Sequence, residues 1–176
     1  MPVLTRYLSP TDYGITAMFS VLLGLTSPFV GLSIQGAIAV KYFDKKGTDL
    51  PKYDGNCFFI LAASSILVAS VFALLARPIS SLTTFPLHWL WLVVPVSAGQ
   101  FIILVLMALW QVQNKALKYG SFQILQTLFN IGLTLILVVG FGKNWQGRIE
   151  GQVLAICLFA ALAFFSLRKN GWLKFV

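Results

Sequence analysis

Long apolar runs alternate with short polar connections along this chain, and the pattern predicts five membrane-crossing helices. A helix needs roughly 20 apolar residues to span the hydrocarbon core of a bilayer, with about 17 as the lower limit. Membrane strands are shorter and alternate strictly between apolar and polar positions, which these runs do not. Backbone polar groups must be paired inside the bilayer, so runs of this length are expected to be helical. The predicted helices cover residues 13–40, 57–76, 89–112, 119–141 and 151–167.

The composition indicates the same class of protein. Of the 176 residues, 58% are hydrophobic and only 10% are charged, and the mean hydropathy is +0.84. A soluble domain usually carries about 25% charged residues. The predicted fold class is therefore all-α: a polytopic membrane helical bundle with about five transmembrane helices, forming a single transmembrane domain over residues 1–176.

The net charge of +8 comes from basic residues at the ends of the apolar runs, not on one face. This distribution argues against nucleic-acid binding and for contact with anionic membrane lipids. Alternate connections carry unequal numbers of Lys and Arg, and the richer side is expected to be cytoplasmic. The richer side holds Lys41, Lys45, Lys46, Lys52, Lys115, Lys118, Arg168, Lys169 and Lys174; the other holds Arg6, Arg77, Lys143 and Arg148.

The first predicted helix carries a stripe of small or polar residues. At 3.6 residues per turn, their spacings of three and four place them on one face. Such a stripe favours close helix packing. The alternative is that it lines a polar cavity, for which Gln35 is the first candidate. Pro28 is expected to bend this helix. The stripe consists of Tyr13, Thr16, Ser20, Gly24, Ser27, Gly31 and Gln35.

The fourth predicted helix repeats the pattern with larger polar groups. Carboxamides that face lipid are costly, so this face should turn toward protein or water. Two interpretations stay open: hydrogen bonding between helices, or a hydrated interior that contacts a polar substrate such as a sugar. The substrate-pathway candidates are Tyr119, Gln123, Gln126 and Asn130, with Thr127 and Thr134 on the same face. In the third helix, Pro95, Ser97, Gly99 and Gln100 form a weakened stretch, either a packing kink or a bend used in transport.

Nothing in the sequence indicates catalysis. It contains no Ser/His/Asp arrangement, no His/Cys metal-binding spacing and no phosphate-binding glycine loop, and Cys57 and Cys157 are isolated. No charged residue lies in the middle of a predicted helix, where it would mark an ion pathway. We therefore expect a protein that is not an enzyme and that has no catalytic residue, metal or cofactor.

Three stretches resemble those of bacterial polysaccharide biosynthesis membrane proteins: "PVLTRYLSPTDYGITAMFSVLLGL", "YGSFQILQTLFNIGLTLILVV" and "NWQGRIEGQVLA". These are the O-antigen, lipopolysaccharide and exopolysaccharide flippases of the multidrug/oligosaccharidyl-lipid/polysaccharide exporter superfamily. The most specific part is a loop with Arg6, Ser9, Pro10, Tyr13 and Gly14.

The resemblance implies that the protein transports undecaprenyl-diphosphate-linked glycans across the bacterial inner membrane by alternating access between two six-helix lobes. Its expected partners are the lipid-linked oligosaccharide, membrane lipids and other glycan-assembly membrane proteins, with no nucleic acid. The five helices would match the second to sixth of the first lobe. The chain is therefore expected to be an N-terminal-lobe fragment, in doubt as a transporter alone because five helices cannot enclose the cavity.

Three other functions are weighed against this one. A drug/cation antiporter of the same superfamily normally needs a membrane-embedded carboxylate, which the predicted helices lack. A glycan polymerase or acyltransferase would be expected to carry a large external loop with arginines or histidine. A structural membrane subunit would use the polar stripes for packing alone.

Overall fold

The computed structural model describes residues 9–32, 36–37, 40, 59–74 and 86–170. Its elements are α2 (Pro10–Gly31), the helix Phe59–Leu74, α5 (Leu87–Val112), α6 (Ala116–Leu135), the short π-helix η1 (Ile136–Gly140) and α7 (Asn144–Lys169). No strand occurs in this part of the chain. The prediction of an all-helical membrane bundle is confirmed.

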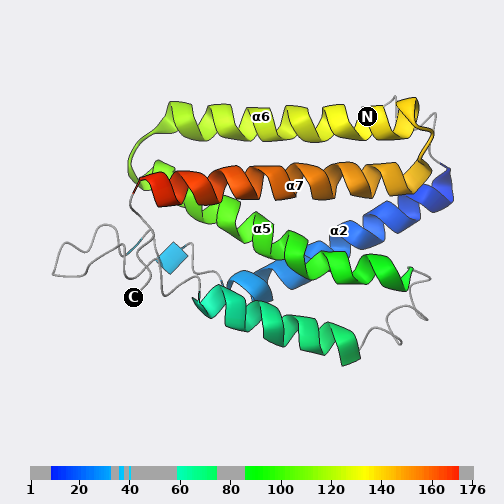
Figure 1. The fold of residues 1–176 in the computed structure, drawn as a ribbon, viewed down its shortest axis with the longest axis horizontal. Helices are drawn as coiled ribbons and strands as arrows, with labels where there is room; N and C mark the ends of the chain where they lie inside the picture. Colours follow the sequence, from blue (N-terminus) through cyan, green and yellow to red (C-terminus); the bar gives the residue numbers. More distant parts are fainter. Residues whose placement is uncertain (1–8, 33–35, 38–39, 41–58, 75–85, 171–176) are drawn as a thin grey trace.

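The helices form a bundle with α5 at its centre. α5 packs against both α2 and α7, and α7 packs in turn against α6, which runs antiparallel beside it (Figure 1). α2, α5 and α7 begin at one end of the bundle, whereas α6 and the helix Phe59–Leu74 begin at the opposite end (Figure 1). Each described helix therefore crosses the bundle in the direction opposite to the one before it.

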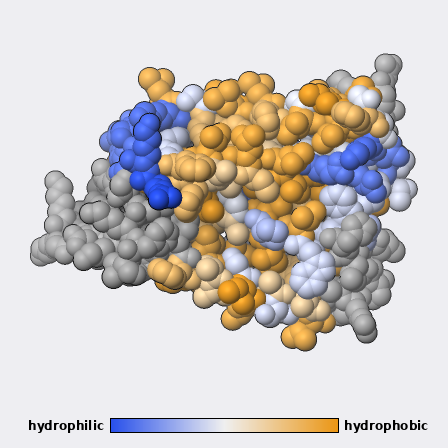
Figure 2. Space-filling view, in the orientation of Figure 1, coloured by the Kyte–Doolittle hydropathy of each residue, from blue (hydrophilic) through white to orange (hydrophobic). Residues whose placement is uncertain are grey.

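Four of these helices are long and apolar enough to cross a membrane, and Phe59–Leu74 is shorter. Figure 2 shows a broad hydrophobic belt between two hydrophilic ends. Described charged residues lie at or within two turns of the helix ends. One end of the bundle carries Lys115, Lys118, Arg168 and Lys169, and the other carries Asp12, Lys143, Arg148 and Glu150.

The buried side chains come mainly from the central helix. Leu90, Val93 and Leu106 of α5 are buried together with Phe19 of α2 and Leu167 of α7. Lipid tails are as apolar as these side chains, so the helices are held together by close packing more than by escape from water. α6 is the least buried of the four long helices, with Thr134 as its buried residue.

α7 packs closely against α6 and η1 at two of its glycines, which lie one turn apart. A Cβ on Gly151 would lie 3.0 Å from the backbone N of Thr134, and one on Gly147 would lie 3.0 Å from the carbonyl carbon of Leu137. Glycines four residues apart commonly let membrane helices approach this closely. The contact lies where α6 passes into η1.

A tight turn in the stretch "QNKALK" joins α5 to α6. Asn114 takes a left-handed conformation with φ of 55°, and Lys115 N–H donates to Trp110 O at 2.9 Å. Asn114 N–H donates to Gln111 O at 3.0 Å. This pair of hydrogen bonds closes a helix C-terminus and satisfies two carbonyls that would otherwise lack a donor.

The structure corrects the predicted starts of two helices. α2 begins at Pro10 instead of residue 13. It ends at Gly31, where Leu32 is left-handed at φ 46°, but residues 36, 37 and 40 are again helical, so the predicted end at residue 40 stays a prediction. α7 begins at Asn144 instead of residue 151. The glycines and charges of "GKNWQGRIEG" are typical of a loop, but Gly147 fits against η1, Gly151 fits against α6, and Arg148 and Glu150 lie in the first two turns of α7.

Candidate functional site

A small polar pocket lies where α2, α5 and α7 meet. Its volume is about 300 Å³, and its lining residues are Ser20, Leu23, Gly24, Ser27, Pro28, Gln100 and Gln152. Three of them belong to the stripe predicted on the first helix. That stripe therefore serves a cavity over Ser20, Gly24 and Ser27, and close packing at Gly31, whose Cβ would meet the Phe101 ring.

The backbone of α2 adds an acceptor to this pocket. Pro28 has no N–H, so the Gly24 carbonyl lacks the hydrogen-bond donor that a helix normally supplies four residues later. Both residues line the pocket. Ser20 Oγ donates to Thr16 O at 3.0 Å, which leaves the Ser20 oxygen able to accept.

The other two helices each contribute one carboxamide. Gln100 of α5 and Gln152 of α7 are half-buried, and neither side chain hydrogen-bonds to a residue that the structure describes. A carboxamide offers two N–H donors and one acceptor oxygen. The pocket thus combines donors and acceptors with no charged group, which suits a neutral ligand rich in hydroxyls.

The predicted face of α6 lies elsewhere. Gln123 and Thr127 are exposed and line a shallow groove made by α6 alone. Tyr119 packs against the apolar core. Gln126 and Asn130 are half-buried, and the Asn130 Oδ1 atom is buried without a hydrogen-bond partner in the described part of the chain. The proposed role of these four residues stays a prediction, and none of them lines the polar pocket.

The structure places the described residues of the predicted loop at the start of α2. Ser9 caps the helix: its Oγ accepts from Asp12 N–H at 3.2 Å, and Asp12 Oδ2 accepts from Ser9 N–H at 2.9 Å. Pro10 occupies the first turn, where its missing N–H costs nothing. The Ser-Pro pair therefore has a sufficient structural explanation as a helix start.

The structure gives less reason for the other two described residues of that loop, Tyr13 and Gly14. Tyr13 is 38% exposed, and its carbonyl accepts from Thr16 Oγ1 at 3.0 Å. Gly14 is exposed with open space beside it, so packing in the described structure does not require glycine there. Arg6 and Gln35 lie outside the described residues.

Sequence reasoning missed Gln152 and gave Gln100 no binding role. The signal that could have found them is a carboxamide within an apolar segment. The same signal occurs on α6, so it does not single out Gln100 and Gln152. What the sequence could not supply was the rotation of each helix about its axis, and this rotation decides which carboxamides meet.

The fold and this neutral pocket define a polytopic helical membrane protein. A search against protein families matched residues 3–167 to the family described as "Polysaccharide biosynthesis protein". The chain therefore belongs to that family, which supports a role in polysaccharide assembly or export. Searches of curated proteins and of solved structures returned no match.

Proposed function

We propose that this chain takes part in moving undecaprenyl-diphosphate-linked saccharides across the bacterial inner membrane. The observation that carries the proposal is the pocket of neutral polar groups between three membrane-crossing helices. Carboxamides and an acceptor carbonyl are costly within a bilayer unless they find partners. Sugar hydroxyls both donate and accept, so they can satisfy each of these groups.

The depth of the pocket fits a transport pathway. Ser20 lies near the middle of α2, and Gln100 lies near the middle of α5. A polar group at that depth lies away from the aqueous interfaces. We infer that the pocket lowers the cost of bringing a saccharide into the span, and that the protein acts as a transporter with no chemical step.

The described carboxylates do not favour the alternative of a cation antiporter. Asp12 is engaged in the cap of α2, and Glu150 pairs with Lys143 at 2.7 Å near the start of α7. Both lie toward one end of the bundle. Neither forms the mid-membrane carboxylate that ion coupling normally uses.

The test removes the two carboxamides while keeping the volume of the side chains. A Gln100→Leu/Gln152→Leu double variant should lower surface glycan and cause lipid-linked glycan to accumulate in the inner membrane. Gln146→Leu is the matched control, because Gln146 is on α7 but exposed and outside the pocket. Membrane abundance is measured for each variant. Normal glycan export by the double variant at normal abundance would refute the proposed pathway.

A further inference from the structure

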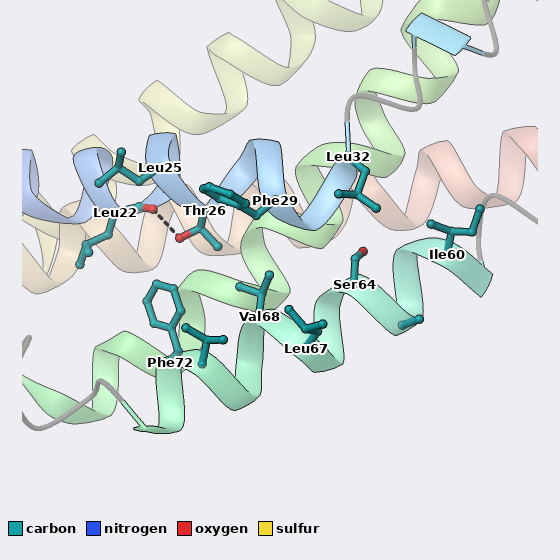
Figure 3. A pocket seen from close by; sticks show the side chains of 12 residues that line it. Leu22, Leu25, Thr26, Phe29, Leu32, Ile60, Ser64, Leu67, Val68 and Phe72 are labelled. Atoms are coloured by element: carbon teal, nitrogen blue, oxygen red, sulfur yellow. Dashed lines mark hydrogen bonds between the residues drawn. The ribbon is translucent and has the colours of Figure 1, made fainter.

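A second, larger cavity separates α2 from the helix Phe59–Leu74. Its volume is about 720 Å³, and ten of its twelve lining residues are apolar, the others being Thr26 and Ser64. Figure 3 shows the two helices as its walls. We refer to this cavity as the apolar groove. Leu25, Phe29 and Leu67 are each more than half exposed along it.

The two hydroxyls in the apolar groove have no donor left for a ligand. Thr26 Oγ1 donates to Leu22 O at 2.6 Å, within α2. Ser64 Oγ lies 2.6 Å from Val30 O and 3.0 Å from Leu61 O, so its single proton is directed to backbone carbonyls. The first of these contacts also ties the two walls together. A ligand of this groove is therefore a hydrocarbon.

The length of the apolar groove matches one leaflet of a bilayer. Its α2 wall runs from Leu22 to Leu32, which at about 1.5 Å per residue is about 15 Å. This is half of the roughly 30 Å thickness of the hydrocarbon core. The wall is the C-terminal half of α2, next to the end of the bundle that carries Lys115, Lys118, Arg168 and Lys169. The positive-inside rule assigns that end to the cytoplasm, so the apolar groove faces the cytoplasmic leaflet.

One segment of α2 forms a wall of both cavities. Leu22, Leu25 and Phe29 line the apolar groove, whereas Ser20, Gly24 and Ser27 line the polar pocket. A phospholipid can offer a chain to the groove, but its charged headgroup stays at the interface and does not reach the middle of the span. A ligand that offers both a hydrocarbon tail and hydroxyls at mid-span is a lipid-linked saccharide in transit.

Resting on the proposed function, we infer that the apolar groove binds the polyprenyl tail of the substrate while its saccharide enters the polar pocket. The tail then stays in a defined position on one side of α2 as the head moves past the other. This assignment gives the exposed apolar residues of α2 and Phe59–Leu74 a role in binding as well as in contact with lipid.

Photocrosslinking tests the assignment on the full chain in nanodiscs of phosphatidylethanolamine and phosphatidylglycerol. One probe is polyprenyl phosphate with a diazirine on its chain, and the other is phosphatidylglycerol with a diazirine on an acyl chain. Two neighbouring alanines provide matched variants, because both are exposed but only Ala63 lines the groove. The bulky substitution Ala63→Phe should abolish labelling of the groove walls by the prenyl probe, and Ala62→Phe should leave it unchanged.

A competition experiment shows whether the hydrocarbon in the apolar groove is a prenyl tail or a phospholipid acyl chain. Unlabelled polyprenyl phosphate should remove the prenyl label, and excess phosphatidylglycerol should not. Labelling that phosphatidylglycerol removes equally well, that Ala63→Phe leaves intact, or that misses the groove walls would overturn the assignment. The probe carries no saccharide, so this result is separate from glycan export. If the Gln100→Leu/Gln152→Leu variant exports glycan normally and the prenyl probe still labels the groove specifically, the saccharide pathway is refuted. If that variant is impaired in export and the prenyl probe does not label the groove, only the tail site is refuted.

Discussion

Replacing Gly151 by alanine tests how closely α6 and α7 pack. The new Cβ would lie 3.0 Å from Thr134 N and 3.1 Å from Thr134 Cα, whereas ordinary van der Waals contact lies at 3.4–4 Å. These two atoms are backbone atoms, so rotating the Thr134 side chain, whose Oγ1 would also lie 3.0 Å away, cannot relieve the contact. The two helices must therefore separate by a few tenths of an ångström, which loosens packing around the contact.

The magnitude follows from two opposing terms. Overpacking typically costs about 1–3 kcal/mol, and alanine gains about 1 kcal/mol over glycine from helix propensity. Gly132→Ala on α6 isolates the first term, because a Cβ there meets nothing within 4 Å and the propensity gain is the same. The free energy of unfolding of Gly151→Ala should thus fall about 1–3 kcal/mol below that of Gly132→Ala.

Reversible unfolding in mixed micelles, followed by circular dichroism, measures this difference. Gly147→Ala should behave like Gly151→Ala, since its Cβ would lie 3.0 Å from Leu137 C and 3.1 Å from Leu137 O. Equal stability of Gly151→Ala and Gly132→Ala would refute the inference that these glycines set the distance between the two helices.

Three further predictions concern other parts of the bundle. Gly31→Ala should destabilise the protein, because its Cβ would lie 2.4 Å from the Phe101 ring, and Phe101→Leu should restore part of the loss; additive effects on unfolding would contradict this coupling. Ser9→Ala should cost about 0.5–2 kcal/mol of unfolding free energy through loss of the cap, so an unchanged unfolding curve would argue against the cap. An impermeant maleimide applied to intact cells should label Gln146→Cys and spare Asn170→Cys; the reverse pattern would invert the proposed orientation.

The sequence was sufficient to predict the helices but not their ends. An apolar run of adequate length has few alternatives in a bilayer, so the five segments could be recognised. Their ends depend on local hydrogen bonds. Ser9 and Asp12 have the spacing of a capping box, a readable signal for the start of α2. The start of α7 was harder, because Gly147 and Gly151 resemble loop residues until a partner helix is placed against them.

The candidate site shows the same limit. Periodicity on one helix identified the stripe that includes Ser20, Gly24 and Ser27, since one helix suffices to define a face. The polar pocket needs three helices at particular rotations, and these rotations result from packing across α5. Gln100 and Gln152 could therefore be recognised as unusual residues, but not as neighbours of one cavity.

The polar residues of α6 differ in how strongly each needs a polar partner, although their side chains look equivalent in the sequence. Thr134 Oγ1 has no hydrogen-bond partner among the described residues, but a threonine in a helix can turn its hydroxyl to the carbonyl one turn earlier. The buried end of the Asn130 amide has no such local option, and exchanging its oxygen and nitrogen still leaves a polar atom in need of a partner. Gln123 is exposed and can move to find one. Of the four predicted residues on α6, Asn130 is therefore the one whose position most requires a polar ligand or water, although Gln123 looks equivalent in the sequence.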